Sequence, residues 1–314
     1  MVESQQYKYV KNVDGEFQIV SEDIPRPGAG QALIKIAYSA INSYDEMNFT
    51  IFKSQRIGSV GEDTLSDLIG KKVSFLAEAW GQYRLADINT LIVLDDSQDL
   101  AKAANASGNP LTALGQLDLV KNHGAKAVVL TSATSQLGKQ FLRLCLSEGI
   151  QVINIVRRQE AINQLKDECG AHYVLNSTSP TFLTDLQILC DELQPTYLID
   201  YIGGNLIGQI FTTMPQSSHL LTVGNQSGET MNLNSGDILF KDKTVSGFML
   251  NRFLQSISLD DRRELMQRIS NDLRDGGKIF GSNIVKEIPL ENFKEGLQQY
   301  QEVASEGKIL INCQ

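Results

Sequence analysis

The sequence predicts an α/β protein, with a doubly wound parallel sheet in the middle of the chain and a β-rich domain built from both ends. Three observations support this class. From residue 126 onward, short apolar runs alternate with helical patterns, whereas the first hundred residues are rich in short strands. Strands of the same kind return after residue 278. Regular alternation of strand and helix is typical of a parallel sheet covered by helices on both faces.

The N-terminal part is expected to contain three short strands before its first helix. These strands are expected at residues 32–38, 73–77 and 83–86. A helical pattern over residues 97–106 is then broken by Gly-Asn-Pro at 108–110. Pro110 suits the first turn of a second helix, expected over residues 111–120. This break is the predicted domain boundary.

Residues 126–158 form the clearest unit in the chain, predicted as strand, tight turn, helix and strand. The apolar run at 128–131 is too short for a helix, and a helical period begins at Leu137. Gly149 ends this helix and a second strand covers residues 152–156. Such a crossover places a helix N-terminus just beyond the carboxyl end of the first strand. Unpaired N–H groups and a positive dipole there favour a phosphate.

The dinucleotide-binding fingerprint G-x-G-x-x-G falls on Ala133, Ser135 and Gly138, so only its last glycine is present. An ordinary strand–helix connection has the same spacing. The turn is rich in hydroxyl groups, which belong to Thr131, Ser132, Thr134 and Ser135. Because hydroxyls can replace part of the close backbone approach that glycine permits, we favour a Rossmann-type cofactor site. Its turn residues are Ser132, Ala133, Thr134, Ser135, Gln136 and Leu137.

Arg157 and Arg158 follow the second strand of this unit. Enzymes that use NAD place an acidic residue here for the ribose 2′-hydroxyl, whereas an arginine accommodates a 2′-phosphate. The planar guanidinium group matches phosphate geometry. The alternative is a pair of solvated arginines at a strand end. We interpret the pair as an indication of NADPH.

Composition and charge exclude several classes of function. A chain of 314 residues with 42% hydrophobic content predicts two domains with sizeable cores. The net charge of −9, without blocks of like charge, argues against a nucleic-acid or membrane partner. No apolar run reaches the ~20 residues that span a bilayer, and the N-terminus has no signal or transit features, so a cytoplasmic location is expected. The four separated cysteines are expected to be buried in a reducing compartment.

A series of short motifs extends along nearly the whole chain. They are Ala40-Ile41-Asn42 with Asp45, Trp80-Gly81-Gln82-Tyr83, Asn109-Pro110-Leu111-Thr112-Ala113, Asp200 with Gly203-Gly204, Val223-Gly224 and Gly307-Lys308. In this order they resemble the medium-chain dehydrogenase/reductases of the alcohol dehydrogenase superfamily, in particular the zinc-independent quinone oxidoreductase and 2-enoyl reductase branch. The resemblance implies a Rossmann cofactor-binding domain at 109–277. It also implies a GroES-like catalytic domain formed by 1–108 and 278–314.

The resemblance implies further site residues. Cofactor contacts are expected from Asn109, Gly203, Val223, Gly224, Phe248 and Lys308. The candidate catalytic residues are Asn42, Tyr44 and Thr112. By resemblance, Asn109 and Thr112 open a helix that faces the nicotinamide, although helix capping is their alternative role. Asn42 and Tyr44 are polar side chains able to donate a hydrogen bond to a substrate carbonyl, and a surface position is the alternative for Tyr44.

The sequence also departs from the pattern it resembles. Zinc-dependent members need cysteine and histidine or glutamate ligands in the N-terminal part of the chain, and the cysteines and histidines of this chain all lie after residue 108. No metal site is therefore expected. The family's proton-donating tyrosine corresponds to a position near Phe52, which has no hydroxyl, and the loop between Lys53 and Gly58 is shortened.

These observations predict a metal-free, NADPH-dependent oxidoreductase that transfers hydride to a quinone or an activated C=C acceptor. The expected partners are a small-molecule substrate and a second copy of the chain in a homodimer. Reduction of an enoyl thioester is the alternative within enzymes. The alternative outside enzymes is a non-catalytic member that has kept the fold and a structural or nucleotide-binding role.

Overall fold

A computed structural model of the chain describes residues 5–42, 68–76 and 80–314. It divides into two compact units: Met1–Asn109 together with Leu259–Gln314, and Pro110–Ser258. We call them the first and the second unit. The sequence assigns residues 259–277 to the cofactor-binding domain, whereas the structure groups helix α10 (Leu259–Arg274) with the first unit. The physical reason is packing on strand β7, where Ser270 Oγ donates to the carbonyl of Val93 at 2.8 Å.

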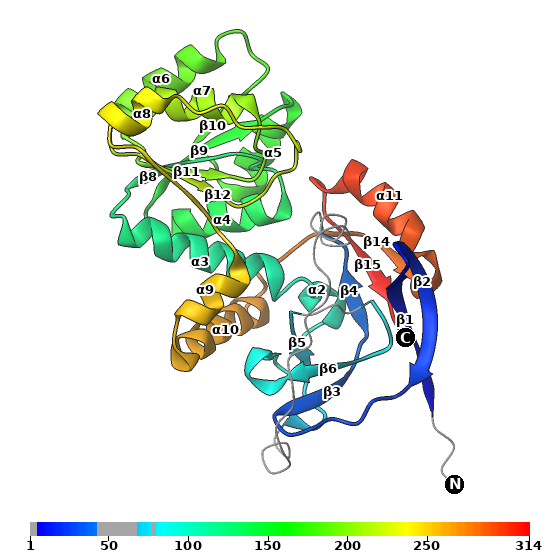
Figure 1. Ribbon diagram of the computed structural model, residues 1–314. Coiled ribbons are helices and arrows are strands. Elements are labelled where there is room, and N and C mark those ends of the chain that lie inside the picture. Colours follow the sequence, from blue (N-terminus) through cyan, green and yellow to red (C-terminus); the bar gives the residue numbers. More distant parts are fainter. Residues whose placement is uncertain (1–4, 43–67, 77–79) are drawn as a thin grey trace. The chain divides into compact units, whose positions relative to one another are not determined.

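The second unit is built around a six-stranded parallel sheet (Figure 1). Its strands are β8 (Ala127–Leu130), β9 (Gln151–Val156), β10 (Tyr173–Asn176), β11 (Tyr197–Asp200), β12 (His219–Thr222) and β13 (Thr244–Gly247). They lie in the order β10-β9-β8-β11-β12-β13, and every pair is parallel. Counted from β8, this is the 3-2-1-4-5-6 order of the Rossmann fold. The predicted doubly wound sheet is confirmed.

Helices cover both faces of this sheet (Figure 1). The helices of this part of the chain are α3 (Gly108–Asn122), α4 (Gln136–Ser147), α5 (Glu160–Cys169), α6 (Phe182–Leu193), α7 (Asn205–Thr213), α8 (Ser235–Phe240) and α9 (Leu250–Ser256). Helices α6 and α7 pack on one face through Leu186, Ile207 and Ile210, and α3 and α4 lie on the other. The chain changes direction across the sheet between β8 and β11. Ligands of such sheets bind at the carboxyl ends of the strands at this switch point.

The first unit is β-rich and is formed by both ends of the chain. Its strands are β1 (Gln6–Val13), β2 (Glu16–Asp23), β3 (Gln31–Lys35), β4 (Tyr38–Ala40), β5 (Val73–Ser74), β6 (Tyr83–Asp87), β7 (Ile92–Val93), β14 (Ile284–Pro289) and β15 (Lys308–Asn312). In the described part of this unit, the helices besides α10 are η2 (Ile88–Thr90), α2 (Leu100–Ala103), η3 (Leu290–Asn292) and α11 (Phe293–Val303). Strand β15 pairs parallel with β14 and antiparallel with β4, which joins the two ends of the chain. The predicted β-rich domain from both chain ends is confirmed.

The sequence predicts one strand at residues 32–38, whereas the structure has parts of two strands there. Strand β3 pairs with β6, and β4 pairs with β15 in another sheet. The change of partner falls at Ile36, whose N–H donates to the carbonyl of Gln82 at 2.9 Å. A continuous apolar alternation cannot reveal a change of partner that distant residues impose.

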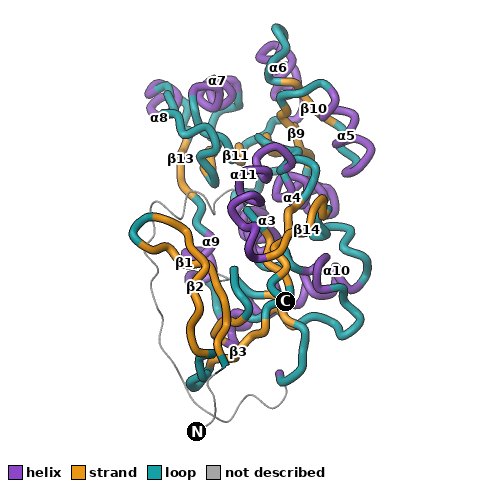
Figure 2. Tube along the Cα trace, turned by 90° about the vertical axis from the view of Figure 1, so that its right-hand side faces the viewer, coloured by secondary structure: helices purple, strands orange, loops and turns teal. Residues whose placement is uncertain are grey.

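Strands β1 and β2 form a long antiparallel hairpin, which is prominent in Figure 2 and is not among the strands predicted from the sequence. Its turn is Asp14-Gly15, with φ of 54° and 93°. Positive φ at both central residues is the geometry that matches the twist of two paired strands, and Asp-Gly is a strong signal for it.

Among the described residues, no helix is long and apolar enough to cross a membrane.

Candidate functional site

The turn between β8 and α4 has the structure that the sequence predicts. Ser135 caps the helix, because its Oγ accepts a hydrogen bond from the N–H of Gly138 at 3.0 Å. A Cβ at Gly138 would lie 2.7 Å from the carbonyl oxygen of Ser132 and 2.8 Å from that of Ala133. Only glycine lets the first turn of α4 approach the preceding backbone this closely. The result is a capped helix N-terminus at the carboxyl end of a central strand, where a phosphate is stabilised.

The hydroxyl groups of this turn are not equally accessible to a ligand. Thr131 is fully buried, and its Oγ1 donates to Asp200 Oδ1 at 2.9 Å and accepts from the N–H of Tyr201 at 3.0 Å. The interpretation of Thr131 as a phosphate donor is therefore wrong. Ser132, in contrast, is half-buried with a φ of 48°, and its Oγ lies 3.3 Å from Gln226 Oε1.

The remaining turn residues lie on both sides of the helix start. Ala133 and Gln136 are buried, whereas Thr134, Ser135 and Leu137 are half-buried. The half-buried residues follow one another around the N-terminus of α4. Their predicted role as cofactor contacts stays a prediction, with the backbone of this turn as its physical basis.

Asp200 ties the fingerprint turn to the next loop. Besides Thr131, its carboxylate accepts the N–H groups of Ile202 at 2.9 Å and Gly203 at 3.0 Å. Burial raises the pKa of this carboxyl group above its ordinary value, against the opposite effect of the three hydrogen bonds. Asp200 thus connects the carboxyl ends of β8 and β11. The D-x-x-G-G pattern was the signal for this loop, but not for its buried partner at Thr131.

Two glycines that the sequence assigns to the site allow the loops after β11 and β12 to pack closely at the carboxyl ends of these strands. Gly203 has a φ of 77°, a conformation that side chains disfavour. A Cβ at Gly224 would lie 2.5 Å from the carbonyl oxygen of Tyr201. The N–H groups of Val223 and Gly224 both donate to the carbonyl of Asp200, at 2.8 and 3.2 Å. The loops after β8, β11 and β12 therefore meet at the carboxyl ends of these strands.

The arginine pair also lies at the carboxyl ends of the strands. Arg157 and Arg158 follow Val156, the last residue of β9, and β9 pairs with β8. Both side chains are exposed. The structure thus brings the arginines and the fingerprint turn to neighbouring strand ends, in positions that a ligand can reach from solvent.

Phe248 has a packing role in the second unit. Its ring is 7% exposed, lies 5.9 Å from the ring of Phe253 and limits the space at Gly115, where a Cβ would meet it at 2.8 Å. The sequence places this residue among the cofactor contacts. The observed contacts of its side chain are with α3 and α9, so the cofactor role stays a prediction.

In the first unit, the structure brings Lys308 and Asn42 together. Lys308 is 2% exposed, and its Nζ donates to Asn42 Oδ1 at 2.6 Å, to Tyr300 Oη at 2.9 Å and to the carbonyl of Ile41 at 3.3 Å. The sequence assigns Lys308 to the cofactor and Asn42 to catalysis, in separate roles. Tyr300 was missed, since a tyrosine on the buried face of a helix is not distinct from other core aromatics in the sequence.

The other candidates are less defined by contacts. Asn109 is 8% exposed and Thr112 is half-buried, both in the first turns of α3. Tyr44 lies outside the described residues. So do Phe52 and the shortened loop beyond it. Their predicted roles stay predictions.

Within the described parts of the chain, no group of three or more His, Cys, Asp or Glu side chains could hold a metal ion. The four cysteines are buried and free, as the sequence predicts. Burial raises the pKa of Cys190 and of Cys313 to about 11, so these thiols stay protonated near neutral pH.

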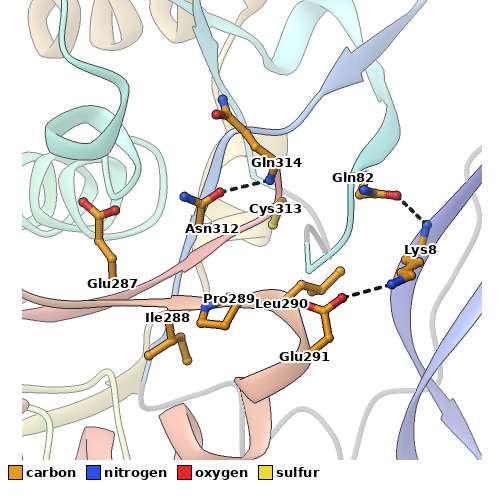
Figure 3. A pocket seen from close by; sticks show the side chains of 10 residues that line it. All are labelled: Lys8, Gln82, Glu287, Ile288, Pro289, Leu290, Glu291, Asn312, Cys313 and Gln314. Carbon is orange, nitrogen blue, oxygen red and sulfur yellow. Dashed lines mark hydrogen bonds and ion pairs between the residues drawn. The ribbon is translucent and has the colours of Figure 1, made fainter.

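A surface pocket of about 420 Å³ lies in the first unit (Figure 3). Lys8 lines this pocket. Its backbone N–H donates to Gln82 Oε1 at 2.8 Å, and its Nζ forms an ion pair with Glu291 Oε1 at 3.1 Å. The pocket also contains the chain end, where the N–H of Gln314 donates to Asn312 Oδ1 at 3.0 Å. These three contacts join polar groups of the pocket to one another, and none of the residues that the sequence associates with cofactor or substrate lines it.

Comparison with known proteins agrees with this architecture. Residues 137–271 match the family model described as zinc-binding dehydrogenase. The mitochondrial enoyl-[acyl-carrier-protein] reductase of Arabidopsis thaliana is 26% identical over 225 residues, which are 70% of this chain and 59% of the relative. A relative of the same name from Caenorhabditis elegans is 23% identical over 94% of this chain and 91% of its own length.

The similarity extends to solved structures. A crystal structure from Mesorhizobium loti, assigned as an NADPH:quinone reductase, aligns with a TM-score of 0.83 and 25% identity. The alignment covers 99% of this chain and 100% of that one. The strand order, the family model and these relatives agree with the order of sequence motifs. The chain belongs to the medium-chain dehydrogenase/reductase superfamily.

Proposed function

We propose that this protein is a metal-independent, NADPH-dependent oxidoreductase that transfers hydride to a quinone or a similarly activated C=C acceptor. The observation that supports the proposal is the arrangement at the carboxyl ends of the strands in the second unit's sheet. A capped helix N-terminus at Ser135 and two exposed arginines, Arg157 and Arg158, stand there on neighbouring strands. This arrangement offers a helix end to a pyrophosphate and guanidinium groups to a 2′-phosphate.

The residues of this edge fit a dinucleotide. Gly138 and Gly224 stand where a Cβ would meet backbone oxygens at 2.7 and 2.5 Å, so the turns lie close to the strand ends. The half-buried Ser132 and Thr134 add hydroxyls beside the turn. NADPH would be held by this turn, the arginines and the loops at Gly203 and Val223. When bound, its nicotinamide supplies the hydride.

The acceptor would be bound with help from Asn42 of the first unit. Its Nδ2 is a donor that can bind a carbonyl oxygen, and the oxygen becomes more negative as hydride adds to the conjugated system. A quinone needs little acid catalysis, because solvent can supply the proton. The phenylalanine at position 52, where a tyrosine would donate a proton in enoyl reduction, favours such an acceptor.

A second candidate is reduction of an enoyl thioester, which the names of the Arabidopsis and Caenorhabditis relatives favour. The two candidates differ in their need for a proton donor, since a positioned general acid contributes about 10²- to 10⁴-fold to rate. The test is NADPH oxidation with a quinone and with a short enoyl thioester, for wild type and Phe52→Tyr. Quinone turnover by the wild type supports the proposal. Enoyl turnover that appears only in Phe52→Tyr favours a decayed enoyl reductase. Tight NADPH binding without turnover in either protein favours a non-catalytic role.

We also propose that the protein is a homodimer through the edge of its six-stranded sheet. Strand β13 lies at the end of the strand order, and all four of its residues are exposed. Beside it in the chain, Leu239 and Phe240 of α8 are 70% and 79% exposed. An exposed edge strand with adjacent apolar side chains is an aggregation risk unless something covers it. Pairing of β13 with a second copy about a two-fold axis would cover both.

A further inference from the structure

Tyr201, which directly follows β11, is bonded to three other elements of the second unit. Its N–H donates to Thr131 Oγ1, at the end of β8, at 3.0 Å. Its carbonyl oxygen accepts the N–H of Gln226, in the loop after β12, at 3.3 Å. Its hydroxyl donates to Gln116 Oε1 of α3 at 2.8 Å, and this contact is buried. Tyr201 therefore bonds α3 to the strand ends where the loops of the proposed cofactor site meet.

Helix α3 contains the residue that the family resemblance places against the nicotinamide. This residue, Thr112, lies one helical turn before Gln116, so the two side chains lie on the same side of the helix. Gly115 packs at another strand end, because a Cβ there would lie 2.8 Å from the ring of Phe248, which follows β13. One apolar contact and one hydrogen bond thus determine where Thr112 lies relative to the strand ends.

The hydrogen bond between Tyr201 and Gln116 is not explained by stability alone. Gln116 is 0% exposed, and among the described residues its Nε2 has no hydrogen-bond partner. A buried donor without a partner costs free energy, whereas an apolar side chain of similar size would fill the space without this cost. A hydrogen bond also requires a defined distance and direction between its two groups, which apolar packing does not. The amide therefore fixes the position of α3 at some cost in stability.

We infer that Tyr201 and Gln116 are positioning residues, which hold α3 so that Thr112 is correctly placed against the nicotinamide during hydride transfer. This inference rests on the proposed function and concerns only residues of the second unit. Hydride transfer depends steeply on the alignment of the reacting groups. Loss of the hydrogen bond should therefore slow the chemical step in a protein that still folds and still binds the adenine half of NADPH.

The main variant replaces both partners, Gln116→Met together with Tyr201→Phe. Replacing both members of a buried hydrogen bond by apolar groups of similar shape is nearly neutral or stabilising, because neither is left unpaired. We therefore expect the free energy of unfolding in urea to equal or exceed that of the wild type. Tyr197→Phe is the matched control, since it removes the hydroxyl of a 4% exposed tyrosine at the amino end of the same strand.

The rate is measured as single-turnover oxidation of bound NADPH by excess quinone. We expect the double variant to be roughly 10- to 100-fold slower than the wild type, since small losses of alignment have effects of this size. Each single variant should lose a similar amount, because either change breaks the same bond. Tyr197→Phe should match the wild type. A double variant that reduces quinone at the wild-type rate would overturn the inference. So would a loss of rate that parallels a loss of stability across the variants, because the bond would then have only a structural role.

Two binding measurements separate this inference from the proposed function. Adenosine 2′,5′-bisphosphate has the 2′-phosphate but no nicotinamide, so its Kd should be the same in all of these proteins. The fluorescence of bound NADPH comes from the nicotinamide and depends on its surroundings, so it should change in the double variant and not in Tyr197→Phe. If the wild type reduces no quinone, the proposed function fails, but the fluorescence comparison still applies. Equal NADPH fluorescence in the wild type and the double variant would refute the positioning role independently of any activity.

Discussion

The arginine pair at the end of β9 gives a prediction whose magnitude follows from its exposure. The perturbation is the double variant Arg157→Ala/Arg158→Ala. A hydrogen bond to a charged group contributes about 1.5 to 3 kcal/mol. Both side chains are exposed, so solvent screening reduces this value. We therefore expect the pair to contribute ~2 to 4 kcal/mol to NADPH binding, or roughly 30- to 800-fold in Kd at about 1.4 kcal/mol per tenfold.

The assay is a fluorescence titration of wild type and variant with NADPH and with NADH at fixed ionic strength. We expect the loss for NADPH alone, because NADH has no 2′-phosphate. Arg252→Ala is the matched control, an exposed arginine of the same unit in α9. The difference between the cofactors should shrink as salt screens the guanidinium groups. An equal loss for NADPH and NADH would refute the reasoning, because the arginines would then act through the fold.

Three further predictions concern the helix turn, the sheet edge and a buried lysine. Gly138→Ala should weaken the binding of NADPH and of NADH to the same extent, because the new Cβ would lie 2.7 Å from the Ser132 carbonyl oxygen and displace the helix turn. Titrations of the variant with both cofactors check this, and unchanged affinities would contradict it. Phe240→Asp should convert the dimer to a monomer in light scattering, since this side chain is 79% exposed beside β13; a dimer that persists, or a monomeric wild type, would contradict the proposed interface. Lys243 donates to the carbonyl of Met214 at 2.8 Å, and burial lowers its pKa. Between the lowered pKa of Lys243 in the folded chain and its ordinary value of 10.5, the unfolded chain binds more protons than the folded chain. The free energy of unfolding should therefore rise with pH in this range. Urea titrations at several pH values should find a smaller rise in Lys243→Met.

The elements that depend on local patterns could be predicted from the sequence. The unit from β8 to β9 was recognised because its apolar period changes within a few residues, and Gly138 was recognised by its spacing from the strand. The family resemblance assigned Gly203 and Gly224 to the cofactor site, and the structure places the loops of both glycines after the carboxyl ends of the parallel strands β11 and β12. The hairpin at Asp14-Gly15 was also within reach, because its turn signal is local.

The details that depend on distant residues could not be predicted in the same way. Thr131 was interpreted as a ligand donor because nothing near it in the sequence indicates its partner, Asp200, which is 69 residues away. Lys308 and Asn42 are 266 residues apart, and only the pairing of β15 with β4 brings them together. The hydrogen bonds of a buried polar group are set by the fold, whereas a motif gives only its approximate place.

The most direct test of the central claim is a single-turnover measurement of hydride transfer. Wild-type protein loaded with NADPH is mixed with excess quinone, and the loss of nicotinamide absorbance is followed. The experiment is repeated with NADPH deuterated on either face of the nicotinamide C4. We expect bound NADPH to be oxidised in one phase, which is slowed by deuterium on one face only, and we expect chelators not to change its rate. Tightly bound NADPH that no quinone oxidises, or a rate that chelators abolish, would contradict the proposed function.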